Sequence, residues 1–199
     1  MEHYFTNNNE LVSNIITLTY QYNSFHFTFL SDNGVFSKKR IDYGSKLLLE
    51  TYLNEVTMEE KVLDVGCGYG FIGSVISRVN GSVVDMVDVN KRALHLAKRN
   101  TKNTSYKGDI FLSDAYQNVK DKYDTVITNP PIRTGKNKVL EILLGAFEHL
   151  NDNGKLYFVI RKDQGALSIK KIIEEKYSIQ MINRSKGYIV YKVNNNKNI

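Results

Sequence analysis

The sequence predicts an α/β fold: a doubly wound, mainly parallel sheet of seven strands that ends in an antiparallel hairpin. Three observations predict it. Short apolar runs alternate with helical stretches between residues 62 and 176, as in βαβ units. A glycine-rich stretch follows the first of these runs, and the last two runs are joined by a connection too short for a parallel crossover. We expect a small β-hairpin and a helix to precede the sheet.

The length and composition are those of one soluble globular domain. The chain has 199 residues, of which 42% are hydrophobic and 24% charged. We expect a single domain over residues 1–199, with the hairpin and helix as an extension over 1–55 and the core over 56–199. A net charge of +6 and a pI near 9.2 favour a polyanionic partner such as nucleic acid, although the lysines are scattered.

The cysteine count and the N-terminus predict a cytoplasmic protein. Cys67 is the single cysteine, so no internal disulfide can form, which fits a reducing compartment. The chain opens with no secretory leader, and no apolar run approaches the roughly 18 residues of a membrane span. The four histidines have no metal-ligand spacing, so we expect neither a metal nor a membrane partner.

The N-terminal extension is expected to contain a polar arm, a hairpin and a helix. Residues 2–13 are polar and rich in asparagine, which indicates a loosely held arm. The apolar runs at 15–22 and 25–30 flank Asn23-Ser24 and form the hairpin. Asp42 is a suitable N-cap for an amphipathic helix over 42–53.

The rest of the chain alternates between the two kinds of element. We expect strands at 62–65, 83–88, 109–112, 125–128 and 156–161, and helices at 71–79, 91–100, 138–150 and 167–176. The runs at 178–184 and 188–193 flank Ser185-Lys186-Gly187 and pair antiparallel.

A glycine-rich loop, Gly66-Cys67-Gly68-Tyr69-Gly70, lies between the first strand and first helix of the sheet. Open α/β sheets bind ligands at this place, beyond the carboxyl ends of the strands. Glycines allow sharp turns and the close approach of a ligand, and the following helix offers free N–H groups. Asp88 ends the next strand and can accept hydrogen bonds from ribose hydroxyls.

The loop alone fits two kinds of cofactor. Gly68, Gly70 and Gly73 also match the G-x-G-x-x-G pattern of dinucleotide-binding folds. Asp64 favours S-adenosylmethionine, because its carboxylate would attract the aminoacyl ammonium of that cofactor but would repel a pyrophosphate. We interpret Cys67 as a small loop residue and not as a nucleophile.

The tetrapeptide Asn129-Pro130-Pro131-Ile132 follows an apolar strand and is therefore expected beside the cofactor. Prolines fix the backbone and lack N–H groups, so the Asn129 side-chain oxygen and the Pro130 carbonyl can be rigid acceptors. Two such acceptors can hold an NH2 group and direct its nitrogen lone pair at the sulfonium methyl. Because the leaving group is already activated, positioning by Asn129 and Pro130 can supply most of the catalysis.

The sequence resembles the class I S-adenosylmethionine-dependent methyltransferases of the small-subunit (16S) ribosomal RNA guanine-N2 type over nearly its whole length. The segments that carry the resemblance are Asp-Asn-Gly-Val-Phe-Ser at 32–37, Ile-Asp-Tyr-Gly-Ser at 41–45, Val-Leu-Asp-Val-Gly-Cys-Gly-Tyr-Gly at 62–70, Val-Asp-Val-Asn-Lys-Arg-Ala-Leu at 87–94 and Asn-Pro-Pro-Ile at 129–132.

This resemblance implies a Rossmann-like fold, the short single-domain form of the family, and S-adenosyl-L-methionine as cofactor. It implies a position near the adenine for Asp114 and Ala115. The residues expected to bind the cofactor are Asp64, Gly66, Cys67, Gly68, Gly70, Asp88, Val89, Asp114, Ala115 and Asn129. The partner implied is ribosomal RNA or the small ribosomal subunit.

The residues expected to bind the substrate surround the Pro-Pro turn. They are Pro131, Ile132, Arg133, Lys136 and Phe36. Ile132 stands where many amino-methyltransferases have an aromatic residue that stacks on the target base, so stacking falls to Phe36 or Tyr116. Arg133 and Lys136, together with Lys138 and Arg161-Lys162, are expected to hold backbone phosphates or to be solvated surface charges.

Three alternatives remain open at this stage. A protein glutamine-N5 methyltransferase is expected to read Asn-Pro-Pro-Tyr, which Ile132 and the basic charge disfavour. A DNA adenine-N6 methyltransferase is disfavoured because no target-recognition insertion is present, and a non-enzymatic binding module because Asn-Pro-Pro is intact. The sequence specifies neither the nucleotide nor the oligomeric state.

Overall fold

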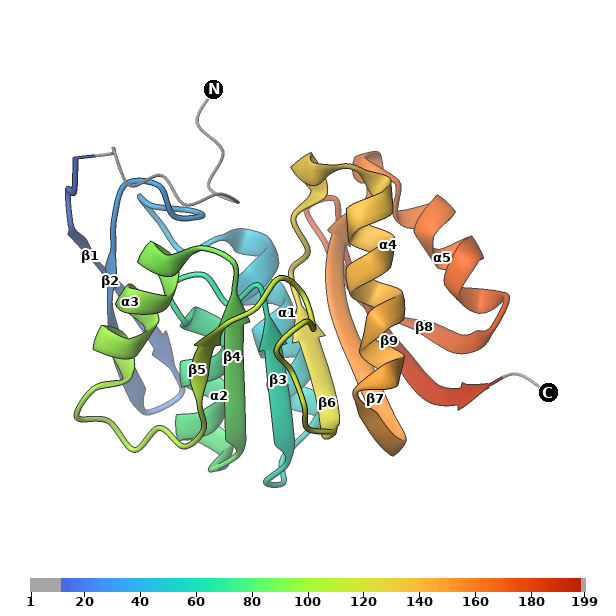
Figure 1. The fold of residues 1–199 in the computed structure, drawn as a ribbon, viewed down its shortest axis with the longest axis horizontal. Coiled ribbons are helices and arrows are strands. Elements are labelled where there is room, and N and C mark those ends of the chain that lie inside the picture. Colours follow the sequence, from blue (N-terminus) through green and yellow to red (C-terminus); the bar gives the residue numbers. More distant parts are fainter. Residues whose placement is uncertain (1–11, 198–199) are drawn as a thin grey trace.

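A computed structural model describes residues 12–197 and contains two sheets (Figure 1). The small sheet is an antiparallel hairpin of β1 (Ile16–Tyr22) and β2 (Phe25–Ser31). The large sheet has seven strands in the order β5-β4-β3-β6-β7-β9-β8. Its strands are β3 (Lys61–Val65), β4 (Val83–Asp88), β5 (Ile110–Leu112), β6 (Tyr123–Thr128), β7 (Leu150–Arg161), β8 (Tyr177–Ser185) and β9 (Tyr188–Lys197).

Five of the strands are parallel, and the last two return antiparallel. Pairs β5-β4, β4-β3, β3-β6 and β6-β7 are parallel, whereas β9 pairs antiparallel with both β7 and β8. The β8–β9 turn consists of Lys186 and Gly187, both with positive φ, which suits a tight hairpin. The predicted fold class, including the antiparallel end of the sheet, is therefore confirmed.

Five α-helices within residues 12–197 cover the two faces of the sheet. They are α1 (Tyr43–Glu55), α2 (Phe71–Asn80), α3 (Lys91–Thr101), α4 (Lys136–Gly145) and α5 (Ala166–Glu174). Alternate residues of β7 point to opposite faces: Tyr157 and Val159 pack with α1 and α2, whereas Leu156 and Phe158 pack with α4 and α5. Figure 1 shows α4 and α5 together in front of the sheet.

The N-terminal hairpin and α1 share a hydrophobic core with the sheet. Tyr20 and Phe29 meet the Phe71 ring edge-on, at centroid distances of 5.0 and 5.5 Å. Leu48 and Leu49 of α1 are fully buried in the same cluster. Asp42 caps α1 by accepting a hydrogen bond from the Ser45 backbone N–H at 2.8 Å, as predicted. The extension is thus held tightly enough to position side chains at the sheet.

One predicted helix is too long. The expected helix over 138–150 ends as α4 at Gly145, continues as a 3-10 turn over Ala146–Glu148, and gives way to β7 at Leu150. Leu150 pairs with Tyr123, whose backbone N–H donates to the His149 carbonyl at 2.9 Å. Pairing with β6 therefore overrides the apolar spacing that suggested a longer helix.

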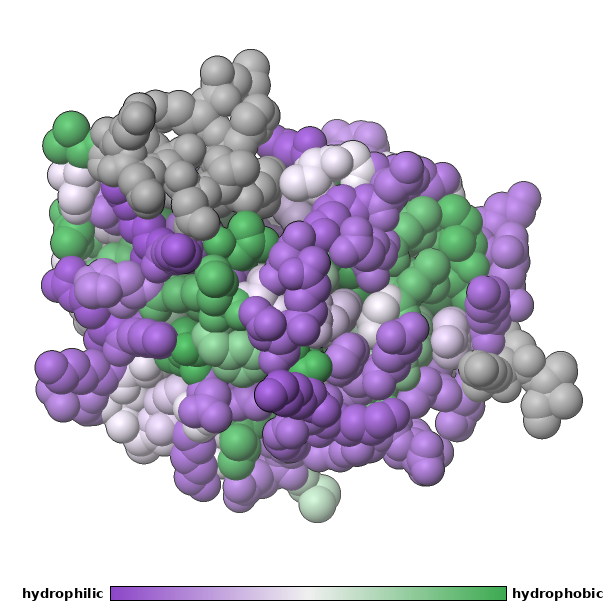
Figure 2. All heavy atoms as spheres, viewed as in Figure 1, coloured by the Kyte–Doolittle hydropathy of each residue, from purple (hydrophilic) through white to green (hydrophobic). Residues whose placement is uncertain are grey.

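The surface of the described residues is mostly hydrophilic on the face in Figure 2, with a hydrophobic area over the region of α5. The predicted polar arm over 2–13 lies almost entirely outside the described residues, but Ser13 and Asn14 donate hydrogen bonds to Asp32. Between residues 12 and 197, no helix combines the length and the hydropathy needed to cross a membrane.

The backbone at Gly108, just before the edge strand β5, packs closely against β4. Its φ is +127°, and a Cβ there would lie 2.1 Å from the Val84 carbonyl oxygen. We predict that Gly108→Ala lowers the free energy of unfolding by about 3 kcal/mol, through overlap added to backbone strain. Gly81→Ala is the matched control, because Gly81 also has a positive φ, but a Cβ there would meet only the Glu59 carboxylate at 3.9 Å, an ordinary contact. This control should cost about 1 kcal/mol. Urea unfolding measures both, and equal losses would contradict the prediction.

Candidate active site

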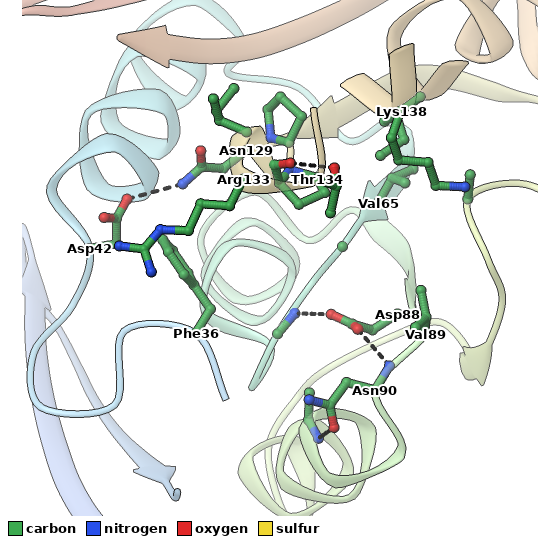
Figure 3. A pocket seen from close by; sticks show the side chains of 18 of the residues that line it. Phe36, Asp42, Val65, Asp88, Val89, Asn90, Asn129, Arg133, Thr134 and Lys138 are labelled. Atoms are coloured by element: carbon green, nitrogen blue, oxygen red, sulfur yellow. Dashed lines mark hydrogen bonds between the residues drawn. The ribbon is translucent and has the colours of Figure 1, made fainter. Parts of the chain in front are cut away.

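A cavity of about 430 Å³ opens at the carboxyl ends of β3, β4, β6 and β7. Side chains and backbone from each of these ends line it, together with Phe36 and Asp42 from the N-terminal extension and Tyr188 from the start of β9 (Figure 3). The predicted glycine loop, Asp88 and the Asn-Pro-Pro segment thus meet at one site. Carboxyl ends of parallel strands share one edge of a sheet, which explains why segments far apart in the sequence converge.

The glycine loop is tied to the end of β4. The backbone N–H groups of Gly66 and Cys67 both donate to the Val87 carbonyl, at 2.8 and 3.0 Å. The Gly68 N–H donates to the Asp88 carboxylate at 2.8 Å. Gly66 and Gly68 have positive φ, and both line the cavity with no side chain in the way. The loop therefore forms a cradle whose backbone a ligand can touch.

Asp88 lies where the predicted ribose contact should be. One of its oxygens accepts from Gly68 and the other from the Asn90 N–H at 2.8 Å. Burial raises the pKa of this carboxyl, and the backbone N–H donors act in the opposite direction. Asp88 lines the cavity together with Val89. Each carboxylate oxygen has a second lone pair, so ribose hydroxyls can donate to it from the cavity side.

Asp64, Cys67 and Gly70 do not line the cavity. Asp64 is buried and accepts from the Gly73 backbone N–H at 2.9 Å, and Gly70 is the N-cap residue of α2. The Cys67 thiol is buried and donates weakly to the Gly68 carbonyl at 3.6 Å. Burial, with Asp88 and Asp64 nearby, raises its pKa, which fits an inert loop residue. A direct contact between these three residues and a cofactor stays a prediction.

The opposite end of the cavity carries the residues predicted to lie near adenine. Ser113, Asp114 and Ala115 line it after β5. The Ser113 hydroxyl donates to the Ala115 carbonyl at 2.9 Å and so stabilises the positive φ of Ala115. Lys138 forms ion pairs with Asp114 at 2.7 Å and Glu141 at 2.8 Å. These ion pairs already compensate the Lys138 charge, which favours the interpretation as a surface charge over that as a phosphate contact.

The side-chain amide of Asn129 is held in one orientation by the N-terminal extension. Its Nδ2 donates to the Asp42 Oδ2 at 3.0 Å and to the Ser45 Oγ at 2.8 Å (Figure 3). A carboxylate can only accept, so the NH2 side of the amide must face Asp42. Among the described residues no hydrogen bond is made to the amide oxygen of Asn129, which is therefore left as an acceptor in a residue that lines the cavity. Asp42 was predicted as a helix cap, but its second contact, with Asn129, was not predicted.

The two prolines shape the turn that follows Asn129. The Thr134 backbone N–H and hydroxyl both donate to the Pro131 carbonyl, at 3.1 and 2.6 Å. Within residues 12–197, no hydrogen bond is made to the Pro130 carbonyl, which leaves it as a second acceptor beside Asn129. Pro130, Pro131, Ile132 and Arg133 all line the cavity.

Two aromatic residues, Phe36 and Tyr188, line the cavity together with the Asn-Pro-Pro segment. The part of the cavity that these residues line is called its acceptor end. Phe36 is 36% exposed. Tyr188 packs against Tyr43 at 5.7 Å and under the Arg161 guanidinium at 5.6 Å. Tyr188 was missed because it reads as the first residue of a strand. The signal that could have found it is the antiparallel hairpin, which returns the chain to the carboxyl edge of the sheet.

Tyr116 cannot take the stacking role that was considered for it. Its hydroxyl donates to the Ile142 carbonyl at 2.7 Å, and its ring stacks on His149 at 4.9 Å. The first contact holds Tyr116 against α4, and the second holds it against the residue that precedes β7. Among the aromatic residues considered from the sequence, Phe36 alone remains for stacking.

The basic residues divide into two groups. Arg133 is exposed and lines the cavity, and Lys136 is exposed at the start of α4 outside the lining. Arg161 lines the cavity but forms a bidentate ion pair with Asp163, at 3.0 and 2.9 Å.

Between residues 12 and 197, no three His, Cys, Asp or Glu side chains group closely enough to hold a metal ion.

Comparisons with known proteins give a family match. Residues 26–192 match the model of the methyltransferase small domain family. The uncharacterized protein YbxB of Bacillus subtilis is 39% identical over 96% of this chain and 97% of its own length. A ribosomal RNA small subunit methyltransferase C of Haemophilus influenzae is 33% identical over 89% of this chain and 54% of its own.

A solved structure has the same fold. A 16S rRNA N2 methyltransferase from T. thermophilus, solved with AdoMet and guanosine, superposes with a TM-score of 0.82 at 22% identity. The superposition covers 92% of this chain and 51% of that protein. The chain thus spans about half the length of the ribosomal RNA methyltransferases that it matches.

Asp64 generates a prediction about pH. Burial, with Asp88 nearby, raises its pKa to about 7, whereas an unfolded chain has an aspartate pKa of about 3.9. The folded ligand-free protein therefore holds this proton through a range in which the unfolded chain loses it, and stability falls as pH rises from about 4 to 7. We predict that Asp64→Asn removes this loss, so the variant gains on the order of 1–4 kcal/mol relative to wild type between pH 5 and pH 8.

Urea unfolding of the ligand-free proteins at the two pH values measures this difference. Asp109→Asn provides a control, because Asp109 is an exposed aspartate that directly precedes β5 of the same sheet. Parallel pH profiles for wild type and Asp64→Asn would rule out the shifted pKa.

Proposed function

The chain belongs to the methyltransferase small domain family, and from that premise we propose that it methylates the exocyclic N2 amine of a guanine in small-subunit ribosomal RNA. Family membership makes it an S-adenosyl-L-methionine-dependent methyltransferase. The acceptor is the part that is proposed. The observation that carries it is the orientation of the Asn129 amide, whose oxygen is left for an amine donor because Asp42 and Ser45 occupy its nitrogen.

The residues present fit S-adenosyl-L-methionine. Gly66 and Gly68 form a cradle without side chains, Asp88 offers free lone pairs for ribose hydroxyls, and Asp114 lies at the far end for the adenine amine. When bound, the cofactor supplies a methyl group activated by its sulfonium. The Lys138 ion pair fixes the Asp114 carboxylate, so this end of the cavity is organised before binding.

The acceptor amine is held by two oxygens. The Asn129 Oδ1 and the Pro130 carbonyl each accept one N–H of the NH2 group, which leaves the nitrogen lone pair pointing away from both oxygens and free to meet the methyl group of the cofactor. This geometry also opposes delocalisation of the lone pair into the ring. After transfer, the methylated nitrogen carries a positive charge, and it becomes neutral by releasing one proton to water. Positioning in a shaped site supplies the catalysis, and no strong base is required before attack.

The acceptor end of the cavity suits a purine turned out of a nucleic acid strand. Phe36 and Tyr188 offer ring faces for stacking, and Gln164 offers polar groups to a base edge. Arg133 and Lys136 are exposed beside the Pro-Pro turn and can hold flanking phosphates. These cations favour RNA over a glutamine side chain as substrate. A cytoplasmic location, where ribosomes are assembled, follows from the same proposal.

The nucleoside content of ribosomal RNA tests the proposed function directly. A strain lacking this protein should lose one N2-methylguanosine from its small-subunit RNA, and wild-type protein should restore it. We predict that Asn129→Ala lowers kcat about 100-fold and does not restore the modification, because one of two amine acceptors is gone. Asn137→Ala, at an exposed asparagine of α4, is the control and should restore it. An intact N2-methylguanosine complement in the deletion strain would refute the proposal.

Asp42 is predicted to be a positioning residue. In Asp42→Ser the shorter side chain can still cap α1 but cannot reach the Asn129 amide. The Ser45 hydroxyl that remains can donate as well as accept, so it no longer fixes which end of the amide faces it. We expect kcat to fall about tenfold, while S-adenosylmethionine affinity and the unfolding temperature stay close to wild type. Steady-state kinetics, calorimetric titration and thermal unfolding measure the three quantities. A variant with unchanged kcat would show that the amide needs no support from α1.

A further inference from the structure

A second hollow, a groove of about 630 Å³, lies at the β8 edge of the sheet. It runs between the start of α5 and the β8–β9 hairpin. The residues that line it are Lys162, Leu167, Lys170, Met181, Arg184, Ser185, Lys186, Gly187, Tyr188, Ile189 and Tyr191. None of these described lining residues is acidic, and four are cationic.

The four cations differ in how far they are already neutralised. Lys170 pairs with Glu174, and the Lys186 ammonium lies over the Tyr43 ring at 4.8 Å. Lys162 and Arg184 are exposed, and neither has an ion pair with the residues between 12 and 197. Placing an anion between them would offset two uncompensated charges.

The floor of the groove is apolar. Leu167 and Met181 are 63% and 52% exposed, so the two side chains together give the groove an apolar surface. Ile189 and Tyr191 lie buried beneath them. Arg184 pairs with Ile189 and Met181 with Tyr191 across the β8–β9 ladder, so these side chains share the face that α5 covers.

The groove adjoins the cavity of the active site. Tyr188 lines both hollows. The Lys162 backbone N–H donates to the Gly187 carbonyl at 2.8 Å, which ties the end of β7 to the hairpin turn between the two hollows. A strand whose target base enters the cavity would therefore meet the groove with its neighbouring nucleotides.

We propose that this groove binds the single-stranded RNA segment next to the target nucleotide. Phosphates lie against Lys162 and Arg184, and unstacked bases lie on Leu167 and Met181. A groove with cations beside apolar side chains suits single-stranded RNA. Each nucleotide brings one phosphate charge for the cations and one base whose face can pack on the apolar side chains. The inference rests on the proposed function for the identity of the target, but RNA affinity tests it separately.

The test compares two double variants that remove the same charge. Lys162→Gln/Arg184→Gln alters the groove. Lys120→Gln/Lys122→Gln is the matched control. Both lysines are exposed just before β6, at the amino ends of the parallel strands, whereas the groove lies at β8 and the β8–β9 turn. The probe is a fluorescein-labelled single-stranded RNA of twelve nucleotides and mixed sequence, and fluorescence anisotropy measures its Kd over a salt series.

We expect the groove variant to bind the probe about tenfold more weakly than wild type at 0.1 M salt, with a salt slope smaller by about 1.4. The control should stay within about twofold. Leu167→Ala/Met181→Ala should weaken binding about fivefold and leave the salt slope unchanged, since it removes ring contacts and no charge. Thermal unfolding shows that each variant is folded.

Equal losses in the two charge variants, or no loss in either, would overturn the groove as an RNA site. Unchanged RNA affinity together with weaker methylation of assembled subunits would indicate an acidic protein partner and would also overturn it. If the deletion strain keeps its N2-methylguanosine, the proposed function fails, and the anisotropy result still decides the groove. If both hold, the groove variant should raise the KM for RNA and leave kcat and cofactor affinity unchanged.

Discussion

The hydrogen bonds from the Asn129 amide to Asp42 and Ser45 are the constraint on which the site depends. They join the N-terminal extension to the end of β6, and they decide which end of the amide faces the cavity. Asp42 can make this contact only because it caps α1, and α1 is held in place by the buried Leu48 and Leu49. In the proposed function, the hairpin and helix that precede the sheet therefore serve the chemistry as well as the packing.

The cofactor side of the cavity is built from backbone and buried carboxylates. Gly66, Cys67 and Gly68 donate to the end of β4, which leaves few side chains between the loop and a ligand. Asp64 is buried behind this side of the cavity and Asp88 is half-buried in its lining, and burial raises the pKa of each. Two such acids near one another reduce the stability of the ligand-free protein. A ligand that carries a positive charge and several hydroxyl donors would relieve that cost.

The antiparallel end of the sheet gives the protein its acceptor side. The β8–β9 hairpin turns at the carboxyl edge of β7, and this turn brings Tyr188 beside Phe36 and the Asn-Pro-Pro segment. The same hairpin forms one wall of the basic groove. A parallel strand in this place would have started at the opposite edge and left the acceptor side open. The topology of the last two strands thus connects the proposed amine-binding site with the groove in which we propose that RNA binds.

The sequence by itself determined the fold class, nearly every element and the two motifs of the site, because these depend on local spacing. Alternating apolar runs define the strands, Gly66–Gly70 requires a turn, and two prolines after Asn129 fix a rigid segment. Only the tertiary structure decided the end of α4, where pairing of Leu150 with β6 overrides helical spacing. It also decided that Asp42 orients Asn129 and that Lys138 is taken up by Asp114. Those contacts join residues up to 87 positions apart, and spacing along the chain carries no record of such distances.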